Sequence, residues 1–193
     1  LADGYFVLPY TIGDYLSDEI STGPIANDSE EFITAEREAK EKLDTLINNN
    51  GSKSVDYFHK KLGKIMWNKC GMARNKMDLE SAIEEISKLR KEFWKDVKVP
   101  GDQNEFNEEL AKAGRVADFL ELGELFAKDA LEREESCGGH FREEYQTKEG
   151  EATRKKEFQF VSAWEYVGEP KNAILHKEKL EYENIEVKER SYK

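Results

Sequence analysis

The sequence has few residues that cross-link a chain or bind metals: it contains two cysteines, three histidines and four prolines in 193 residues. Cys70 and Cys137 lie far apart, and neither has a ligand-like spacing to a histidine. This pattern disfavours a disulfide framework and a zinc site. It fits a reducing, cytoplasmic compartment.

Long apolar runs and positive charge are also lacking. No run approaches the roughly 20 apolar residues that span a bilayer. The N-terminus does not have the basic and then apolar pattern of a signal peptide. The formal net charge of −11 argues against nucleic acid as a partner, because phosphate recognition needs a positive surface. Ten Phe, eight Tyr and three Trp argue against disorder, so we expect a folded, mostly helical protein.

The opening segment, LADGYFVLPYTIGDYL, is more apolar than a native chain terminus usually is. We therefore expect it to pack against something larger. Our interpretation is that residues 1–26 are the end of a preceding domain, and that the chain is a piece of a longer protein.

Residues 27–145 show the apolar periodicity of helices. A helix with Asn27, Asp28 or Ser29 as its N-cap is predicted to bury one face and to end at residues 48–51. A shorter amphipathic segment and two longer helices follow it, the last from about residue 106 to about residue 135. The predicted core positions of the first helix and of the short segment are, respectively, Phe32, Ala35, Ala39, Leu43, Leu46 and Ile47, and Val55, Phe58, Leu62, Ile65 and Met66.

The last helix has an apolar arc that is too wide for burial against a single neighbour. Gly114 and Gly123 would allow another backbone to approach it closely. After it, aromatic residues alternate along residues 158–166, as in a strand. A turn at residues 169–172 and a second β segment with a one-residue slip are then predicted. The aromatic face is Phe158, Phe160, Trp164 and Tyr166, and the second segment carries Leu180, Tyr182, Ile185 and Val187.

These patterns predict a mainly α fold. We expect a three-helix, spectrin-repeat-like bundle at residues 27–145 with an extra short helix. An N-terminal helical segment at residues 1–26 precedes it, and a small β-like tail at residues 146–193 packs on it.

Three features of the sequence contain residues that could form a chemical site. In ESCGGHFREEY, Cys137 and His140 resemble a nucleophile–base dyad, but a helix C-terminus opposes thiolate formation. The glycines between them favour a helix cap followed by a docking loop. In WNKCGMARN, Arg74 has no phosphate-binding glycine pattern beside it, and Met66, Trp67 and Met72 are more typical of core. The third feature is a set of acids interleaved with Lys128 and Arg133, typical of a solvated or ion-paired face: Glu121, Glu124, Asp129, Glu132, Glu134 and Glu135.

The string RVADFLELGELFAKDALEREESCGGHFREEYQT resembles the last long helix, and the loop after it, of succinate dehydrogenase and fumarate reductase flavoprotein subunits. GKIMWNKCGMARN, FVSAWEY and LEYENIEVKERSYK are similar to other parts of the same region, in order. LADGYFVLPYTI is similar to the helix that leaves the family's flavin-binding domain, which implies that residues 1–26 are the end of an FAD-binding domain. Cys137 and Gly139 depart from the family pattern R-x-E-S-R-G-A-H-x-R-x-(D/E), which usually has Arg and Ala there. The positions that match it are Arg133, Glu135, Ser136, Gly138, His140, Arg142 and Glu144.

The resemblance implies a parent enzyme that interconverts succinate and fumarate at FAD and passes electrons to an iron–sulfur subunit and a quinone. The family's FAD-binding and substrate-binding residues lie upstream, so none is assigned here as a catalytic, cofactor or metal residue. The chain alone should be inactive.

The implied role is architectural, with the flavin-binding domain and the iron–sulfur subunit as partners and the membrane anchor reached only indirectly. The location would be the inner face of the cytoplasmic membrane. The candidate docking residues are His140, Arg142, Glu135 and Arg133. The alternative is a free-standing helical interaction module, which would have no reason to expose an apolar N-terminal segment.

Overall fold

The structure is a computed structural model that describes residues 1–20, 23–102 and 105–186. Its internal contacts divide the chain into two compact units, Leu1–Lys42 and Leu43–Lys193. Each unit is described by itself. The domain boundaries expected after residues 26 and 145 stay predictions.

The N-terminal unit is helical, as predicted for its first segment. Its side chains are largely exposed, including Tyr5 at 71% and Phe6 at 72%. The predicted core face of the following helix is also mostly exposed, with Phe32 at 50% and Leu43 at 43%, so that prediction was wrong for most of the helix. Apolar spacing indicates which face of a helix can be buried, not whether a neighbour covers it. The elements are η1 (Asp3–Val7), α1 (Leu8–Tyr10), η2 (Thr11–Tyr15), α2 (Ser17–Ile20) and α3 (Glu30–Asn48), of which residues 43–48 belong to the second unit.

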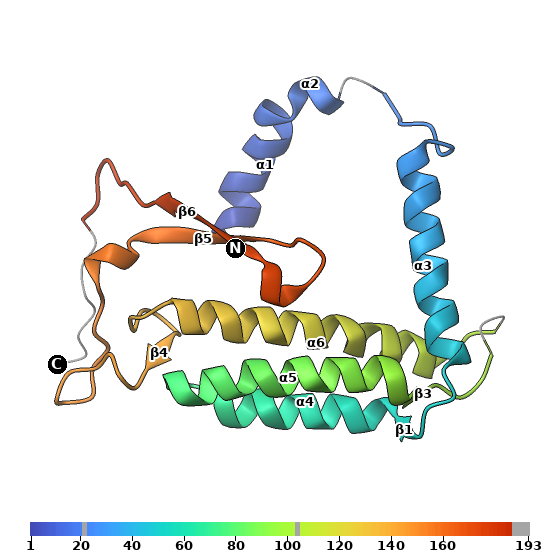
Figure 1. The fold of residues 1–193 in the computed structure, drawn as a ribbon. Coiled ribbons are helices and arrows are strands. Elements are labelled where there is room, and N and C mark those ends of the chain that lie inside the picture. Colours follow the sequence, from blue (N-terminus) through green and yellow to red (C-terminus); the bar gives the residue numbers. More distant parts are fainter. Residues whose placement is uncertain (21–22, 103–104, 187–193) are drawn as a thin grey trace. The chain divides into compact units, whose positions relative to one another are not determined.

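The second unit is built on a three-helix bundle of α4 (Val55–Lys69), α5 (Lys76–Asp96) and α6 (Glu108–Glu132), which lie side by side (Figure 1). Each helix begins with a side chain that accepts a hydrogen bond from a backbone N–H of the first turn. These N-caps satisfy donors that the helix itself leaves unpaired. The caps are Ser54, Asn75 and Asn107. The mainly α prediction is confirmed, although the segment expected to be an extra short helix is a full member of the bundle.

The core lies between these three helices. Phe58 and Phe93 are fully buried and pack edge to face, with their ring centroids 5.2 Å apart. Burial of each such side chain contributes roughly 1.5–3 kcal/mol. Gly123 lets α6 approach α4, because a Cβ there would lie 3.3 Å from a methyl of Leu62. The close approach predicted at Gly114 was wrong, since nothing lies within 4 Å of the corresponding position.

Two residues interpreted as core are on the surface. Trp67 is 84% exposed and Met72 is 90% exposed, whereas Met66 packs against the core. Ile65 belongs to the inner face of α4, and each residue turns a helix by about 100°, so Trp67 points away. Their apolar character alone did not distinguish a buried position from an exposed one.

The C-terminal part forms a hairpin that was only partly predicted. β5 (Phe160–Glu165) pairs antiparallel with β6 (Ile174–Lys179), with η4 (Pro170–Asn172) between them and η3 (Lys156–Phe158) before them. The second strand was predicted too late, because the chain reverses at η4 and the next residues pair at once. Phe158 and Tyr166 lie outside β5, and Leu180, Tyr182 and Ile185 lie outside β6. Val187 falls outside the described residues.

Two further pairs of short strands connect the ends of the bundle. β1 (Lys53–Ser54) pairs in parallel with β3 (Val97–Lys98), and β2 (Ala73–Arg74) pairs in parallel with β4 (Phe141–Arg142). Within the part of the chain that the structure describes, no helix has the length and apolarity that crossing a bilayer requires.

Candidate functional site

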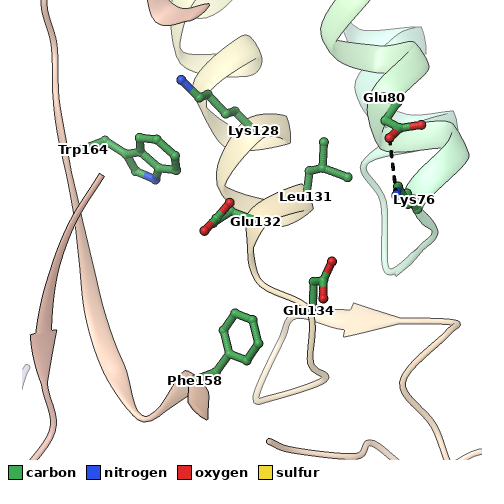
Figure 2. A pocket seen from close by; sticks show the side chains of 8 residues that line it. All are labelled: Lys76, Glu80, Lys128, Leu131, Glu132, Glu134, Phe158 and Trp164. Atoms are coloured by element: carbon green, nitrogen blue, oxygen red, sulfur yellow. Dashed lines mark ion pairs between the residues drawn. The ribbon is translucent and has the colours of Figure 1, made fainter. Parts of the chain in front are cut away.

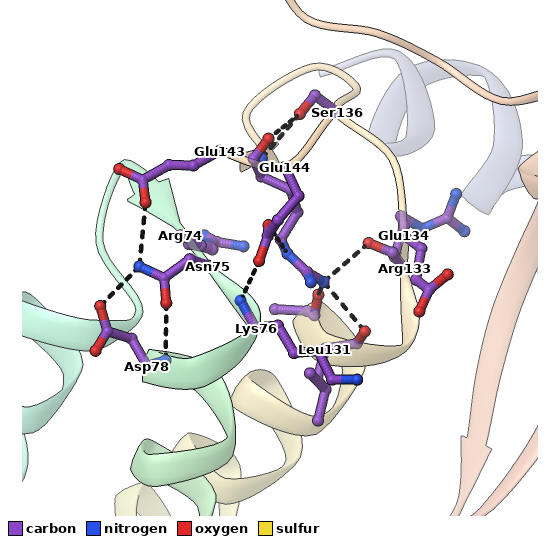
Figure 3. A network of polar contacts seen from close by, with 12 residues as sticks. Arg74, Asn75, Lys76, Asp78, Leu131, Arg133, Glu134, Ser136, Glu143 and Glu144 are labelled. Atoms are coloured by element: carbon purple, nitrogen blue, oxygen red, sulfur yellow. Dashed lines mark hydrogen bonds and ion pairs between the residues drawn. The ribbon is translucent and has the colours of Figure 1, made fainter. Parts of the chain in front are cut away.

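The loop after α6, residues 133–145, closes one end of the bundle (Figure 3). Its β4 strand pairs with β2, and the backbone N–H of Glu143 donates to the carbonyl of Arg74 at 2.8 Å. The loop therefore lies between the C-terminus of α6 and the N-terminus of α5. It contains all four candidate docking residues.

Cys137 and His140 face each other across a tight turn. Their backbone N–H and C=O groups bond reciprocally at 2.8 and 3.0 Å, and Gly138 has a φ of +59°. A positive φ at the first of two central residues is typical of a type II′ hairpin turn. The helix itself ends at Glu132, so the prediction that Gly138 and Gly139 end it was wrong: they form the hairpin instead.

Arg142 caps the C-terminus of α6 from the loop. Its side chain is almost fully buried, and Nη1 donates to the carbonyls of Ala130 at 2.9 Å and Leu131 at 3.1 Å. These are among the last carbonyls of the helix, which have no partner within it. The positive charge also lies at the negative end of the helix dipole. Nε donates to Glu144 at 3.1 Å.

Glu144 caps the N-terminus of α5 in the same way. Its carboxylate accepts a hydrogen bond from the backbone N–H of Lys76 at 2.5 Å. Burial acts to raise the pKa of Glu144, but the bond from Lys76 and the charge of Arg142 outweigh it and leave the pKa below its ordinary value. The carboxylate is therefore ionised at neutral pH and favours the helix start.

His140 connects two arginines, and its partners define its tautomer. Nε2 lies 2.9 Å from the carbonyl oxygen of Arg133, which can only accept, so Nε2 carries the proton and donates it. Nδ1 lies 2.9 Å from Nη1 of Arg74, which can only donate, so Nδ1 accepts. Burial lowers the pKa of His140, and the charges of Arg74, Arg142 and Arg133 lower it further. Because both ring nitrogens are occupied, the imidazole is not available as a base for Cys137.

Arg133 and Glu135 join the end of α6 to β5 and to the segment just before it. Arg133 binds Glu135 at 2.9 Å and donates to the carbonyls of Phe158 and Phe160, each at 3.0 Å. Glu135 is fully buried, and its second oxygen accepts from the backbone N–H of Lys155 at 2.9 Å. The structure thus brings the four candidate residues together, but their contacts are with this chain. Their docking role stays a prediction.

The sequence did not identify a second buried ion pair. Glu124 is 1% exposed and accepts from Arg90 at 3.3 Å, while Arg90 also binds Glu169 at 2.5 Å. Burial raises the pKa of Glu124 above its ordinary value. The acids of residues 121–135 were expected on a solvated or ion-paired face. Glu124 and Glu135 are ion-paired, but both are buried and therefore not solvated. The signal available was that Glu124 lies four residues after Leu120, on the buried face.

A surface depression of about 500 Å³ lies beside the loop (Figure 2). Its lysines have partners already: Lys76 lies 3.9 Å from Glu80, and Lys128 donates to three carbonyls of the hairpin turn. Within the described ranges, no group of three or more potential metal ligands occurs. The depression is lined by Lys76, Glu80, Lys128, Leu131, Glu132, Glu134, Phe158 and Trp164.

The comparison with known families decides the assignment. Residues 59–192 match the family described as fumarate reductase flavoprotein C-term. The chain belongs to this family. The resemblance seen in the loop motif is thereby confirmed over most of the chain.

Curated relatives agree with this family. The fumarate reductase flavoprotein subunit of Haemophilus influenzae is 26% identical over 139 residues, which cover 72% of this chain and 23% of the relative. That of Helicobacter pylori strain J99 is 27% identical over 140 residues, 72% of this chain and 20% of the relative. An uncharacterized FAD-dependent oxidoreductase of Methanocaldococcus jannaschii is 31% identical over 150 residues, 71% of this chain and 26% of the relative. The chain thus spans about a fifth to a quarter of the length of these relatives.

Solved structures show the same fold. A chain of Escherichia coli quinol fumarate reductase superposes with a TM-score of 0.73 and 20% identity, over 90% of this chain and 29% of that chain. A chain of the Mycobacterium smegmatis Sdh1 complex gives 0.68 and 21%, over 86% of this chain and 27% of that one.

Proposed function

We propose that this chain is the non-catalytic C-terminal domain of the FAD-containing subunit of a fumarate reductase or succinate dehydrogenase. The observation that carries the proposal is the match of residues 59–192 to a family described as the C-terminal part of fumarate reductase flavoproteins. The parent subunit would bind FAD, interconvert succinate and fumarate, and pass electrons through an iron–sulfur subunit to a quinone. It would lie on the inner face of the cytoplasmic membrane.

The contacts in the loop support an architectural role for this region. Arg142, Glu144, Glu135 and Arg133 are bound to helix ends or to the hairpin, and His140 is held neutral between two arginines. Side chains that are hydrogen-bonded within the chain in this way fix the conformation of the loop at residues 133–145. In this proposal, His140, Arg142, Glu135 and Arg133 support docking by fixing the loop that meets the flavin-binding domain or the iron–sulfur subunit.

The exposed N-terminal unit argues against the alternative, a free-standing interaction module. Tyr5, Phe6 and Ile12 are more than half exposed, which an independent protein would have no reason to maintain. In the proposed parent subunit, such residues would be covered by the rest of the polypeptide.

The test compares the isolated chain with the full-length flavoprotein that contains it. We expect flavin absorbance and fumarate reduction or succinate oxidation in the full-length protein only. A full-length protein without flavin or turnover would contradict the proposal. So would flavin binding by the purified 193-residue chain.

A further inference from the structure

A groove between α6 and β5 exposes a continuous apolar surface. Leu122 is 61% exposed, Phe126 46% and Val161 49%, and all three line one depression together with Leu125. We call this surface the α6–β5 groove. It accounts for the wide apolar arc of α6, because the side of the helix away from the bundle core is apolar as well. Single exposed apolar residues are normal, but a contiguous group marks an interaction site.

Arg74 stacks on Phe126, one of the residues that line this groove. The carbon at the centre of its guanidinium group lies 4.9 Å from the centroid of the Phe126 ring. Nε donates to the carbonyl of Gly71 at 2.9 Å, and Nη1 bonds to His140 at 2.9 Å. The side chain is thus held in place from three directions, and Nη2 has no hydrogen-bond partner among the described residues.

Three other arginines of the same unit are paired with carboxylates, whereas Arg74 is not. Arg90, Arg133 and Arg142 each bind a carboxylate at 3.3 Å or less. In the part of the chain that the structure describes, no carboxylate lies within 4.0 Å of Arg74. Burial lowers the pKa of Arg74, and the charge of Asp129, which acts to raise it, does not outweigh the loss of water.

We propose that Arg74 and the α6–β5 groove form one docking site, whose occupant carries a carboxylate beside an apolar side chain. The fork of a guanidinium group binds a carboxylate through two parallel hydrogen bonds. The groove would bury the apolar side chain next to it. Arg74 forms no ion pair with the described residues, although the chain as a whole has a net charge of −11 and Asp129 lines the same groove, so its Nη2 can bind a carboxylate of the occupant.

The inference rests on the proposed function and places the occupant in the flavoprotein subunit outside this chain. The relatives supply the reason: 20–23% of the length of two fumarate reductase subunits matches this chain, so most of each subunit lies elsewhere. A second copy of the chain is the rival occupant, and the experiment separates the two.

The experiment uses the full-length flavoprotein with the photoreactive residue benzoylphenylalanine in place of Leu122. Irradiation followed by peptide mapping should give a cross-link to a segment of the same polypeptide outside residues 1–193, beside an Asp or Glu. Arg74→Glu should lower the cross-link yield roughly tenfold or more, because the paired carboxylate would then be repelled. Lys88→Glu makes the same change of charge at a side chain that is 70% exposed, and it should leave the yield unchanged.

Charge reversal completes the test. Replacing the mapped acid by Arg should restore the cross-link in the Arg74→Glu protein. Arg74→Lys, which keeps the charge, reports on docking if Arg74→Glu fails to fold, and it should retain part of the yield. The inference is overturned by a cross-link to a second copy, by no cross-link, or by a yield indifferent to Arg74. Flavin content and turnover of the unsubstituted protein test the proposed function separately: an active enzyme without the cross-link contradicts this inference alone.

Discussion

Arg142 and Glu144 bind each other at 3.1 Å while each occupies the end of a different helix. Arg142 holds carbonyls at the C-terminus of α6, and Glu144 holds a backbone N–H at the N-terminus of α5. Each charge has the sign that its helix end favours. The two residues therefore fasten neighbouring helix ends through one ion pair, and the loop that carries them is part of the bundle's framework.

Arg142→Ala should destabilise the chain strongly. The substitution removes the donor of the Ala130 and Leu131 carbonyls and one donor of Glu144, and each buried polar group left unsatisfied costs about 1–3 kcal/mol. Arg142→Lys should cost less, because the ammonium can satisfy some of these acceptors. Urea denaturation of the chain measures both variants. The control is Arg115→Ala, at an exposed position of α6, with an expected change within about 0.5 kcal/mol. An Arg142→Ala midpoint equal to that control would contradict the capping role.

His140 should make stability depend on pH. Its folded pKa lies below the ordinary value of 6.5, so the unfolded chain binds the proton more readily. The stability that His140 contributes is present above about pH 6.5 and is lost as the pH falls toward the folded pKa. The free energy of unfolding, measured from pH 8 to pH 5, should therefore decline more in the wild type than in His140→Gln. His176→Gln, at a side chain that is 60% exposed, should follow the wild type. Parallel curves for the wild type and His140→Gln would contradict the prediction.

The sequence predicted α5 and α6 as long helices and identified the buried face of α4, because apolar periodicity reflects burial against neighbouring helices, but it assigned α4 the part of an extra short helix. The prediction failed where the burial of a side chain depends on whether a neighbouring segment covers it. The apolar face of α3 follows the same rule, yet Phe32 and Leu43 are exposed. Trp67 was assigned to the core from its character, although it lies on the outer side of α4.

The sequence identified which residues form the candidate site, but it did not predict the contacts that those residues make. The loop motif identified Arg133, Glu135, His140 and Arg142, and the structure brings them together. Their partners could not be foreseen, because the carbonyls of Ala130 and Leu131 are backbone groups with no sequence signature. The pairing of Arg90 with Glu124 joins residues 34 positions apart and depends on how α5 packs on α6.

Trp164 should contribute to hairpin docking less than a core residue does. Its indole N–H donates to Asp129 at 2.8 Å and Lys128 lies 4.7 Å from its ring centroid, but the side chain is only half-buried. Full burial would make Trp164→Ala cost roughly 3–5 kcal/mol. We expect about 1.5–3 kcal/mol, and about 1–2 kcal/mol for Trp164→Phe, which loses the hydrogen bond and part of the ring but keeps an aromatic side chain.

Thermal denaturation measures the loss from these two variants, and hydrogen exchange at β5 shows whether the hairpin is released. Tyr182→Ala is the control, because that side chain is 50% exposed and lies outside both strands. If Trp164→Ala matched Tyr182→Ala in both measurements, the indole would have no docking role.

Two glycines should respond to alanine in opposite directions. At Gly51, a Cβ would lie 2.1 Å from the carbonyl oxygen of Asp96 and 2.5 Å from that of Val97. Both contacts are with backbone, at the last residue of α5 and the first residue of β3, which cannot move aside as a flexible side chain could. Gly51→Ala should therefore cost about 1–3 kcal/mol or more, as overpacking does. Gly63 is exposed within α4, and nothing lies within 4 Å of its Cβ position. Gly63→Ala should stabilise the chain by roughly 0.5–1 kcal/mol, because alanine loses less backbone freedom on folding.

The two glycine variants control for each other, since both add one methyl group and differ only in surroundings. Urea denaturation of the same preparation should move the Gly51→Ala midpoint down and the Gly63→Ala midpoint up, with equal slopes. If Gly51→Ala proves neutral, residue 51 does not approach the end of α5 closely, and the parallel pairing of β1 with β3 that depends on this approach is wrong. A Gly63→Ala variant that is destabilised would mean that its side of α4 is covered by a neighbour, because only contact there could oppose the gain in helix propensity.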